Sequence, residues 1–300
     1  MAINTVVPDH MSSGNTASPA SRLKDLLNQD SFLIMPCCYD GLTARLIERA
    51  GFPLTFMSGF TVSAAKNALP DTGLLSFGEM LEQGRAICAA TRLPVIGDGD
   101  TGYGNAMNVK RTVTGYAQAG FAGIMIEDQV SPKRCGHTRG KSTIGFDEAC
   151  MRVQAAVDAR NEGADILIMA RTDARETHGL EEALERMSTF SEIGADILFL
   201  EAPESVEEMR RFCNEVNGIK MANMLEQGKT PILQPDELAE LGYKIAAYPL
   251  TLMLSAIRAM ESALQDLKSG RHPADLAEFT HLQDIVGFPG YYEEEQRYKL

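Results

Sequence analysis

Short apolar runs alternate along the chain with amphipathic stretches of helical length, beginning near Leu23. The runs are rich in Ile, Leu, Met and Val, a composition that suits strands buried on both faces of a parallel sheet. The expected strands are Phe32–Cys38, Leu54–Ser58, Pro94–Asp98, Ala122–Glu127, Ile166–Ala170, Asp196–Glu201, Ile219–Asn223 and Tyr243–Ala247.

The segments between these runs have the periodicity of helices that pack one face on a sheet. The expected helices are Gly41–Ala50, Phe77–Thr91, Asn108–Ala119, Phe146–Glu162, Gly179–Ile193, Ser205–Val216, Pro235–Leu241 and Leu250–Ser269. Several of them are followed by a glycine, which favours the left-handed conformation that closes a helix. These glycines are Gly51, Gly120, Gly163, Gly194 and Gly242.

Eight strands that are each followed by a helix predict an α/β fold, a closed TIM (β/α)8 barrel. An open doubly wound sheet is the alternative, but the chain has no glycine-rich phosphate fingerprint of that fold. We expect one barrel domain over residues 22–300, with a C-terminal helical or tail segment. Residues 1–21 are rich in Ser, Asn, Thr, Gly and Pro and predict a flexible N-terminal extension without a secretory signal.

Composition narrows the function classes. The 300 residues carry a formal charge of −13, which would repel a phosphate backbone and argues against a nucleic-acid partner. No apolar run reaches the ~18 residues of a membrane span. The six cysteines form no C-x-x-C pair, so we expect reduced thiols and a cytoplasmic protein.

In a TIM barrel the chemistry lies at the carboxyl ends of the strands. The residues at those expected ends are Tyr39, Asp40, Ser58, Gly59, Asp98, Asp100, Glu127, Asp128, Arg171, Asp173, Glu201, Asn223 and Tyr248. So many carboxylates around one mouth repel each other unless a cation binds there.

A metal site is expected at Asp98 and Asp100, which follow the third strand in the segment "VIGDGDTGYGN". Two carboxylates at this spacing can converge on Mg²⁺, which prefers a few carboxylates plus waters. An Asp-Gly turn without a metal is the simpler interpretation. Glu127 at the end of the next strand favours the metal, and Asp71 is a further candidate ligand.

The segment from Asp128 to about Gly145 is far longer than an ordinary βα loop. It gathers basic side chains around Cys135, namely Lys133, Arg134, His137, Arg139 and Lys141. Such a positive island suits an anionic substrate, and its charges would lower the pKa of the thiol. A solvated loop with a chance cysteine is the alternative. Arg171 could bind a substrate carboxylate through two hydrogen bonds, form a structural ion pair with Glu201 or Asp173, or do both.

These motifs resemble the isocitrate lyase/phosphoenolpyruvate mutase superfamily, in its 2-methylisocitrate lyase-like branch. The resemblance runs from about Leu23 and rests on "SGF", "LPDTGLL", "GDGDTGYGN", "IEDQ", "PKRCGH", "ARTDA" and "ANMLEQGKTP". It implies a Mg²⁺-dependent barrel, with Mn²⁺ as an alternative metal. It also implies that the last helix swaps between subunits of a homotetramer, a dimer of dimers.

The resemblance also assigns roles to residues. It implies that the metal environment consists of Asp71, Asp98, Asp100 and Glu127. The implied catalytic residues are Cys135, His137, Lys133 and Arg134. The implied substrate-binding residues are Ser58, Gly59, Phe60, Gly136, Arg171, Glu201, Asn223 and Leu225.

The implied reaction is a retro-aldol cleavage of a 2-hydroxy di- or tricarboxylate, in which Cys135 protonates the enediolate that remains after a 2-oxo acid leaves. Two positions depart from the isocitrate and methylisocitrate lyase pattern. Phe56 replaces a tyrosine that could act as base, which leaves His137, Tyr103 or a metal-bound hydroxide as candidates. Leu225 replaces a threonine or serine that helps to bind a third carboxylate. This favours an alkylated malate and resembles the 2,3-dimethylmalate lyases and petal death proteins of the superfamily.

Other functions stay open on the same scaffold. A phosphonomutase of the carboxyphosphonoenolpyruvate type would share the metal site, and so would an oxaloacetate hydrolase. A non-catalytic barrel kept for binding or assembly is the alternative from a different class. Cys135 and the complete acidic set argue against that last alternative.

Overall fold

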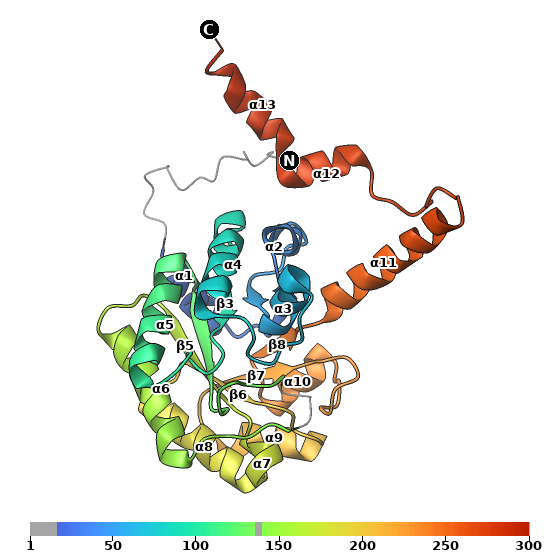
Figure 1. Cartoon of the computed structure of the whole chain (residues 1–300). Coiled ribbons are helices and arrows are strands. Elements are labelled where there is room, and N and C mark those ends of the chain that lie inside the picture. Colours follow the sequence, from blue (N-terminus) through green and yellow to red (C-terminus); the bar gives the residue numbers. More distant parts are fainter. Residues whose placement is uncertain (1–16, 136–139, 300) are drawn as a thin grey trace. The chain divides into compact units, whose positions relative to one another are not determined.

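The computed structural model describes residues 17–135 and 140–299, and its centre is a closed barrel of parallel strands in the order β1 to β8 (Figure 1). The strands are β1 Leu33–Cys38, β2 Thr55–Met57, β3 Val95–Asp98, β4 Gly123–Glu127, β5 Leu167–Thr172, β6 Ile197–Leu200, β7 Ile219–Asn223 and β8 Ile245–Tyr248. Pairing of β1 with β8 closes the barrel, with Leu33 opposite Ile245. The predicted (β/α)8 barrel and its expected strands are confirmed.

Helices precede, connect and follow the strands along the chain, and the connecting helices surround the barrel (Figure 1). They are α1 Pro19–Leu27, α2 Gly41–Arg49, α3 Gly59–Asn67, α4 Phe77–Ala90, α5 Ala106–Ala119, α6 Phe146–Asn161, α7 Ala174–His178, α8 Leu180–Ile193, α9 Val206–Glu215, α10 Pro235–Leu241, α11 Thr251–Lys268, α12 Phe279–Val286 and α13 Phe288–Gln296. The expected helices form within about two residues of their predicted bounds. Their closing glycines are left-handed as predicted, with φ from 85° at Gly51 to 120° at Gly163.

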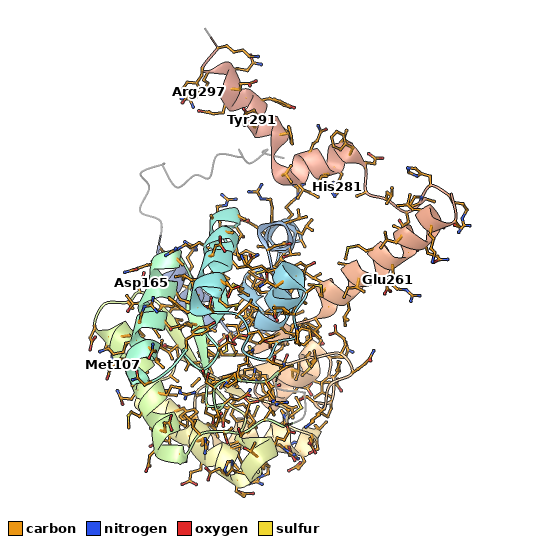
Figure 2. All side chains as sticks on the ribbon, in the orientation of Figure 1. Met107, Asp165, Glu261, His281, Tyr291 and Arg297 are labelled. Atoms are coloured by element: carbon orange, nitrogen blue, oxygen red, sulfur yellow. The ribbon has the colours of Figure 1, made fainter. Side chains whose placement is uncertain are left out.

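Large apolar side chains fill the inside of the barrel, where the sticks are crowded (Figure 2). Methionines contribute much of this packing, because Met35, Met125 and Met169 are all buried in one cluster. Helix α1 adds Leu23 and Leu27 to the same cluster. A filled interior leaves the carboxyl ends of the strands as the place for a site.

The sequence analysis did not predict the helices α1 and α3, and α3 bears on the site. Helix α1 begins at Pro19 with Ser18 as its N-cap, inside the stretch that was expected to be an extension. Helix α3 follows β2 directly, so that Ser58, Gly59 and Phe60 lie at a helix N-terminus. That position places backbone N–H groups at the rim of the barrel.

The chain divides into two compact units by its internal contacts, Ser18–Met253 and the residues from Leu254 onward. The first unit contains the whole barrel. The second contains most of α11, which matches the expected helix Leu250–Ser269, and the helices α12 and α13, which the sequence analysis covered as a C-terminal helical or tail segment. Among the described residues, no helix is both long and apolar enough to cross a membrane.

Candidate active site

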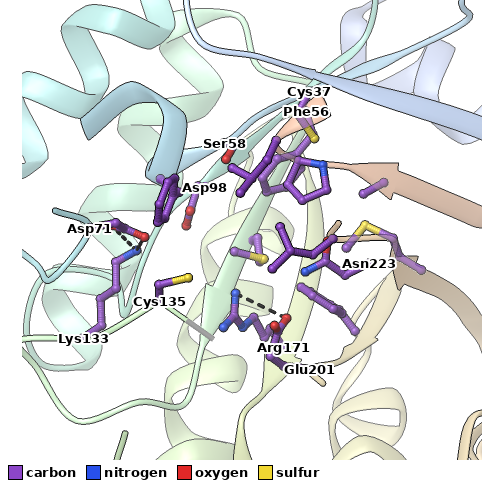
Figure 3. A pocket seen from close by; sticks show the side chains of 18 of the residues that line it. Cys37, Phe56, Ser58, Asp71, Asp98, Lys133, Cys135, Arg171, Glu201 and Asn223 are labelled. Atoms are coloured by element: carbon purple, nitrogen blue, oxygen red, sulfur yellow. Dashed lines mark hydrogen bonds and ion pairs between the residues drawn. The ribbon is translucent and has the colours of Figure 1, made fainter. Parts of the chain in front are cut away.

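A cavity of about 220 Å³ opens at the carboxyl ends of the barrel strands (Figure 3). Eleven of the residues predicted from the sequence line it, namely Ser58, Phe60, Asp71, Asp98, Lys133, Arg134, Cys135, Arg171, Glu201, Asn223 and Leu225. Gly59, Asp100 and Glu127 lie beside it without lining it, and Gly136 and His137 are outside the described residues. The structure thus brings most of the predicted set to one place.

Asp98, the last residue of β3, is held by backbone donors around the cavity. Its Oδ2 accepts a hydrogen bond from the N–H of Gly59 at 3.1 Å, and its Oδ1 accepts one from the N–H of Asp100 at 3.0 Å. A Cβ atom at Gly59 would lie 2.5 Å from Oδ2, so this approach requires glycine. Burial raises the pKa of Asp98 to about 6, with Lys133 opposing the effect and Asp100 adding to it.

The loop after β3 has an unusual backbone. Asp100 and Tyr103 adopt left-handed conformations with φ of 48° and 58°, which non-glycine residues rarely do. Such strain costs about 1–3 kcal/mol per residue and is found mainly at functional sites. Burial and the Asp100 carboxylate raise the pKa of Tyr103 well above its usual value, which favours a protonated phenol over a base.

Lys133 reaches into the acidic side of the site (Figure 3). Its Nζ lies 2.6 Å from Asp71 Oδ1 and 2.9 Å from Asp100 Oδ1, and its side chain is only 6% exposed. Lys141 is also buried, with Nζ 2.9 Å from Asp173 Oδ1. Lys133 and Lys141 therefore do not provide the positive charge that was expected around Cys135, because buried carboxylates neutralise both of them.

The acidic residues suit a hard divalent cation in their chemistry. Glu127 is almost fully buried, and its Oε1 has no hydrogen-bond partner within the part of the chain that the structure describes. No three His, Cys, Asp or Glu residues among those described lie close enough together to enclose a metal. Mg²⁺ commonly binds through one or two carboxylates and keeps several waters, so one or two of Asp98, Asp100 and Glu127 still fit it.

Arg171, on β5, is held by several carboxylates at once. Its guanidinium makes two hydrogen bonds to Asp173, at 2.9 and 3.0 Å. Its Nε also lies 3.3 Å from Glu127 Oε2, and its Nη1 lies 3.7 Å from Glu201 Oε2. Both ion pairs considered from the sequence are present, and the side chain still borders the cavity, where it can meet an anionic ligand.

Cys135 is half-buried and points into the cavity from the loop after β4 (Figure 3). Its backbone N–H donates to the carbonyl of Asp71 at 3.2 Å, which fixes it near the acidic residues. The other cysteines have pKa values raised by burial, to about 12 for Cys38. Among the cysteines, this position suits proton exchange with a bound ligand best.

Sequence reasoning missed much of the apolar wall of the cavity. Beside Phe56 and Leu225, this wall contains Met125, Phe199, Met221, Ala247, Pro249 and Leu250. Each of the strand residues in this set was assigned to the barrel core from its hydrophobicity alone. The sequence could have indicated that Met125 belongs to the site. It lies two residues before Glu127 and therefore faces the same side of β4.

Fold and site together define a TIM-barrel enzyme whose cavity combines carboxylates, cationic side chains and a thiol. The family model for phosphoenolpyruvate phosphomutase matches residues 23–268. The chain belongs to this phosphoenolpyruvate mutase/isocitrate lyase family, as its motifs indicated.

Several relatives within this family are lyases. The chain is 42% identical to 2,3-dimethylmalate lyase of Eubacterium barkeri, over 93% of this chain and 98% of that protein. It is 39% identical to 2-methylisocitrate lyase of Aeropyrum pernix, over 91% and 89% of the two chains. A solved structure of phosphonopyruvate hydrolase with oxalate and Mg²⁺ superposes with a TM-score of 0.83 at 27% identity, covering 94% of this chain and 99% of that one. The relatives support a carbon–carbon lyase.

Proposed function

We propose that the protein is a Mg²⁺-dependent lyase that cleaves the C2–C3 bond of an alkylated 2-hydroxy dicarboxylate by retro-aldol chemistry. The observation that carries this proposal is the division of one cavity into a charged side and an apolar side. The charged side presents Asp98, Lys133, Arg171 and Cys135, and the apolar side is formed largely by strand residues and the segment after β8. Such a cavity matches a small molecule that carries both carboxylates and alkyl groups.

The residues of the site take separate roles in this reaction. Arg171 and the N–H groups at the start of α3 orient the substrate carboxylates. Asp98, Asp100 and Glu127 would hold the divalent cation, with Asp71 beside them. Stabilisation of the negative charge that develops on the substrate oxygens is the chemistry that such a cation supplies when bound. The phosphonopyruvate hydrolase structure with Mg²⁺ and oxalate supports this part of the proposal.

Proton movement completes the reaction. The 2-hydroxyl group loses its proton to a general base, for which His137 is the candidate side chain. The C2–C3 bond then breaks, and C2 becomes the carbonyl carbon of a 2-oxo acid. The electron pair of the broken bond remains on the C3 fragment as an enediolate. Cys135 donates a proton to that carbon, which yields the second carboxylate product. The apolar wall excludes water while the fragment is negatively charged.

The proposal is tested by incubating the purified protein with Mg²⁺ and a panel of hydroxy diacids, and measuring 2-oxo acid release. The panel contains 2,3-dimethylmalate, 2-methylisocitrate, isocitrate and malate, with oxaloacetate and phosphonopyruvate as probes of other chemistry. We expect the fastest cleavage for the alkylated malate. Turnover of phosphonopyruvate or oxaloacetate alone would contradict the lyase assignment.

Substrate selection should depend on Leu225, which is 8% exposed and borders the cavity. A third substrate carboxylate beside it would lack a donor, and a lost hydrogen bond to a charged group costs about 1.5–3 kcal/mol, or about 10- to 150-fold. We expect kcat/KM for 2,3-dimethylmalate to exceed that for 2-methylisocitrate by such a factor. Leu225→Thr should narrow the gap.

Leu225→Val is the matched control, because valine has the shape of threonine without its hydroxyl group. The valine variant should keep the preference for the alkylated malate even if its overall rate falls. If the wild-type protein cleaves 2-methylisocitrate best, the role given to Leu225 is incorrect.

We also propose a homotetramer in which the last helices pack against a second copy. Helix α11 exposes a regular series of apolar side chains, at Leu254, Ile257, Met260, Leu264 and Leu267. A stripe of this length is rarely left in water by a soluble protein. Light scattering after gel filtration should report a tetramer, and a monomer would contradict the assembly. The six free thiols support a reducing, cytoplasmic location.

A further inference from the structure

The side chain of Gln129 makes an unusual double contact with the loop that carries Cys135. Gln129 lies two residues beyond the end of β4 and is only 1% exposed. Its Nε2 donates to the carbonyl of Arg134 at 2.9 Å, and its Oε1 accepts from the N–H of Arg134 at 2.9 Å. One amide group thereby satisfies both backbone groups of one residue, as a neighbouring strand would.

The backbone of Gln129 is itself firmly held. Arg152 on α6 donates from Nη1 to the carbonyl groups of Glu127 and Gln129, both at 3.0 Å. Gln129 also pairs with Thr143 in an antiparallel bridge, and the neighbouring Val130 N–H donates to the Ser142 carbonyl at 2.8 Å. The contact to Arg134 therefore starts from a fixed point on the barrel, where the bridge to Thr143 ties the outgoing arm of the loop to the returning arm.

Arg134 is the residue immediately before Cys135. The N–H of Cys135 donates to Asp71, so three hydrogen bonds fix the peptide groups that lead into the thiol, and two of them come from Gln129. We infer that Gln129 is a positioning residue, which holds Cys135 at the distance from the bound substrate that proton transfer needs. The inference rests on the proposed function, because that reaction gives Cys135 its role.

The alternative is that Gln129 only stabilises the fold, as buried glutamines in cores often do. The two roles differ in what they change. A structural contact alters the thermal midpoint, whereas a positioning contact alters kcat with little effect on KM. Misplacement of a reacting group by about 1 Å can cost about 100-fold in rate.

Two variants of Gln129 separate these roles. Gln129→Met keeps the length of the side chain and removes both hydrogen bonds. Gln129→Glu keeps the shape but cannot donate to the Arg134 carbonyl. We expect kcat for the best panel substrate to fall about 10- to 100-fold in both, with KM changed less than about threefold. Gln154→Met, which removes an exposed amide on α6, is the matched control and should keep the wild-type kcat.

Two measurements on the resting protein do not depend on turnover. Hydrogen exchange of the Arg134 amide should become at least about tenfold faster in Gln129→Met, because its acceptor is gone. Alkylation of Cys135 should also accelerate, since a loosened loop admits the reagent. Both rates should be unchanged in Gln154→Met.

Faster exchange together with an unchanged kcat would show that the contact does not serve catalysis and would overturn the inference. Unchanged exchange and alkylation would overturn it as well. If Gln129→Met does not fold, kcat, KM and the Cys135 alkylation rate of Gln129→Glu decide, because that variant keeps the acceptor of the Arg134 amide and loses only the donor to its carbonyl. If the wild-type protein releases no 2-oxo acid from any substrate, the proposed function fails, and the alkylation rates still report whether Gln129 positions the thiol.

Discussion

Replacing Cys135 with serine should lower kcat of the lyase reaction by about 100- to 10,000-fold, the usual contribution of a positioned general acid. The thiol lines the cavity beside Lys133 and Arg171 and is the cysteine that a substrate in this cavity would meet from the loop after β4. A free thiol has a pKa of about 8.5, whereas a serine hydroxyl is a far weaker acid. Serine is close to cysteine in size, so folding should be unaffected.

Steady-state rates of 2-oxo acid release measure this effect, and Cys150→Ser provides the control. Cys150 is also half-buried, but it lies on α6 and does not line the cavity. Its variant should keep the wild-type rate. Equal rates for Cys135→Ser and the wild-type protein would remove Cys135 from the mechanism and direct attention to another acid, such as Tyr103.

The barrel could be predicted because each of its strands and helix ends is specified by a short segment of sequence. A buried strand needs a continuous apolar run, and a helix that ends before a strand needs a left-handed residue, for which Gly120 and Gly194 are examples. Helix α3 was missed for a related reason. Its sequence, "GFTVSAAKN", mixes β-branched and small residues without a clear polar face, and its helical state depends on the barrel that it packs on.

The site could be predicted only as a set of residues at one rim. The rule that barrel chemistry follows the strand ends identified Asp98, Arg171 and Glu201 before any geometry was known. The partners of the lysines could not be predicted, because Lys133 meets Asp71 across sixty-two positions of sequence. The role of Gln129 could not be predicted for the same reason. Its sequence position is that of an ordinary polar loop residue, and only the folded loop shows that its amide binds the backbone of Arg134.

Removing the divalent cation should abolish turnover. An excess of chelator should reduce the rate below about 1% of the untreated enzyme, because a bound metal contributes several kcal/mol of transition-state stabilisation and each 1.36 kcal/mol is a factor of ten. Asp100→Asn should weaken Mn²⁺ binding, measured by titration without substrate, by about 10- to 100-fold. The buried side chain of Asp100 lies 2.9 Å from Lys133, so the loss of its charge also leaves that ammonium with one carboxylate fewer.

Asp25→Asn is the control for this titration, since Asp25 is exposed on α1 and the exchange removes the same charge. Mn²⁺ affinity and rate should be unchanged in that variant, which separates a ligand effect from a change in net charge. Full activity in excess chelator would reject the metal assignment. Equal Mn²⁺ affinity in Asp100→Asn and the wild-type protein would instead place the cation nearer Asp98 and Glu127. The Oε1 atom of Glu127 is one of the buried oxygens without a hydrogen-bond partner in the described structure.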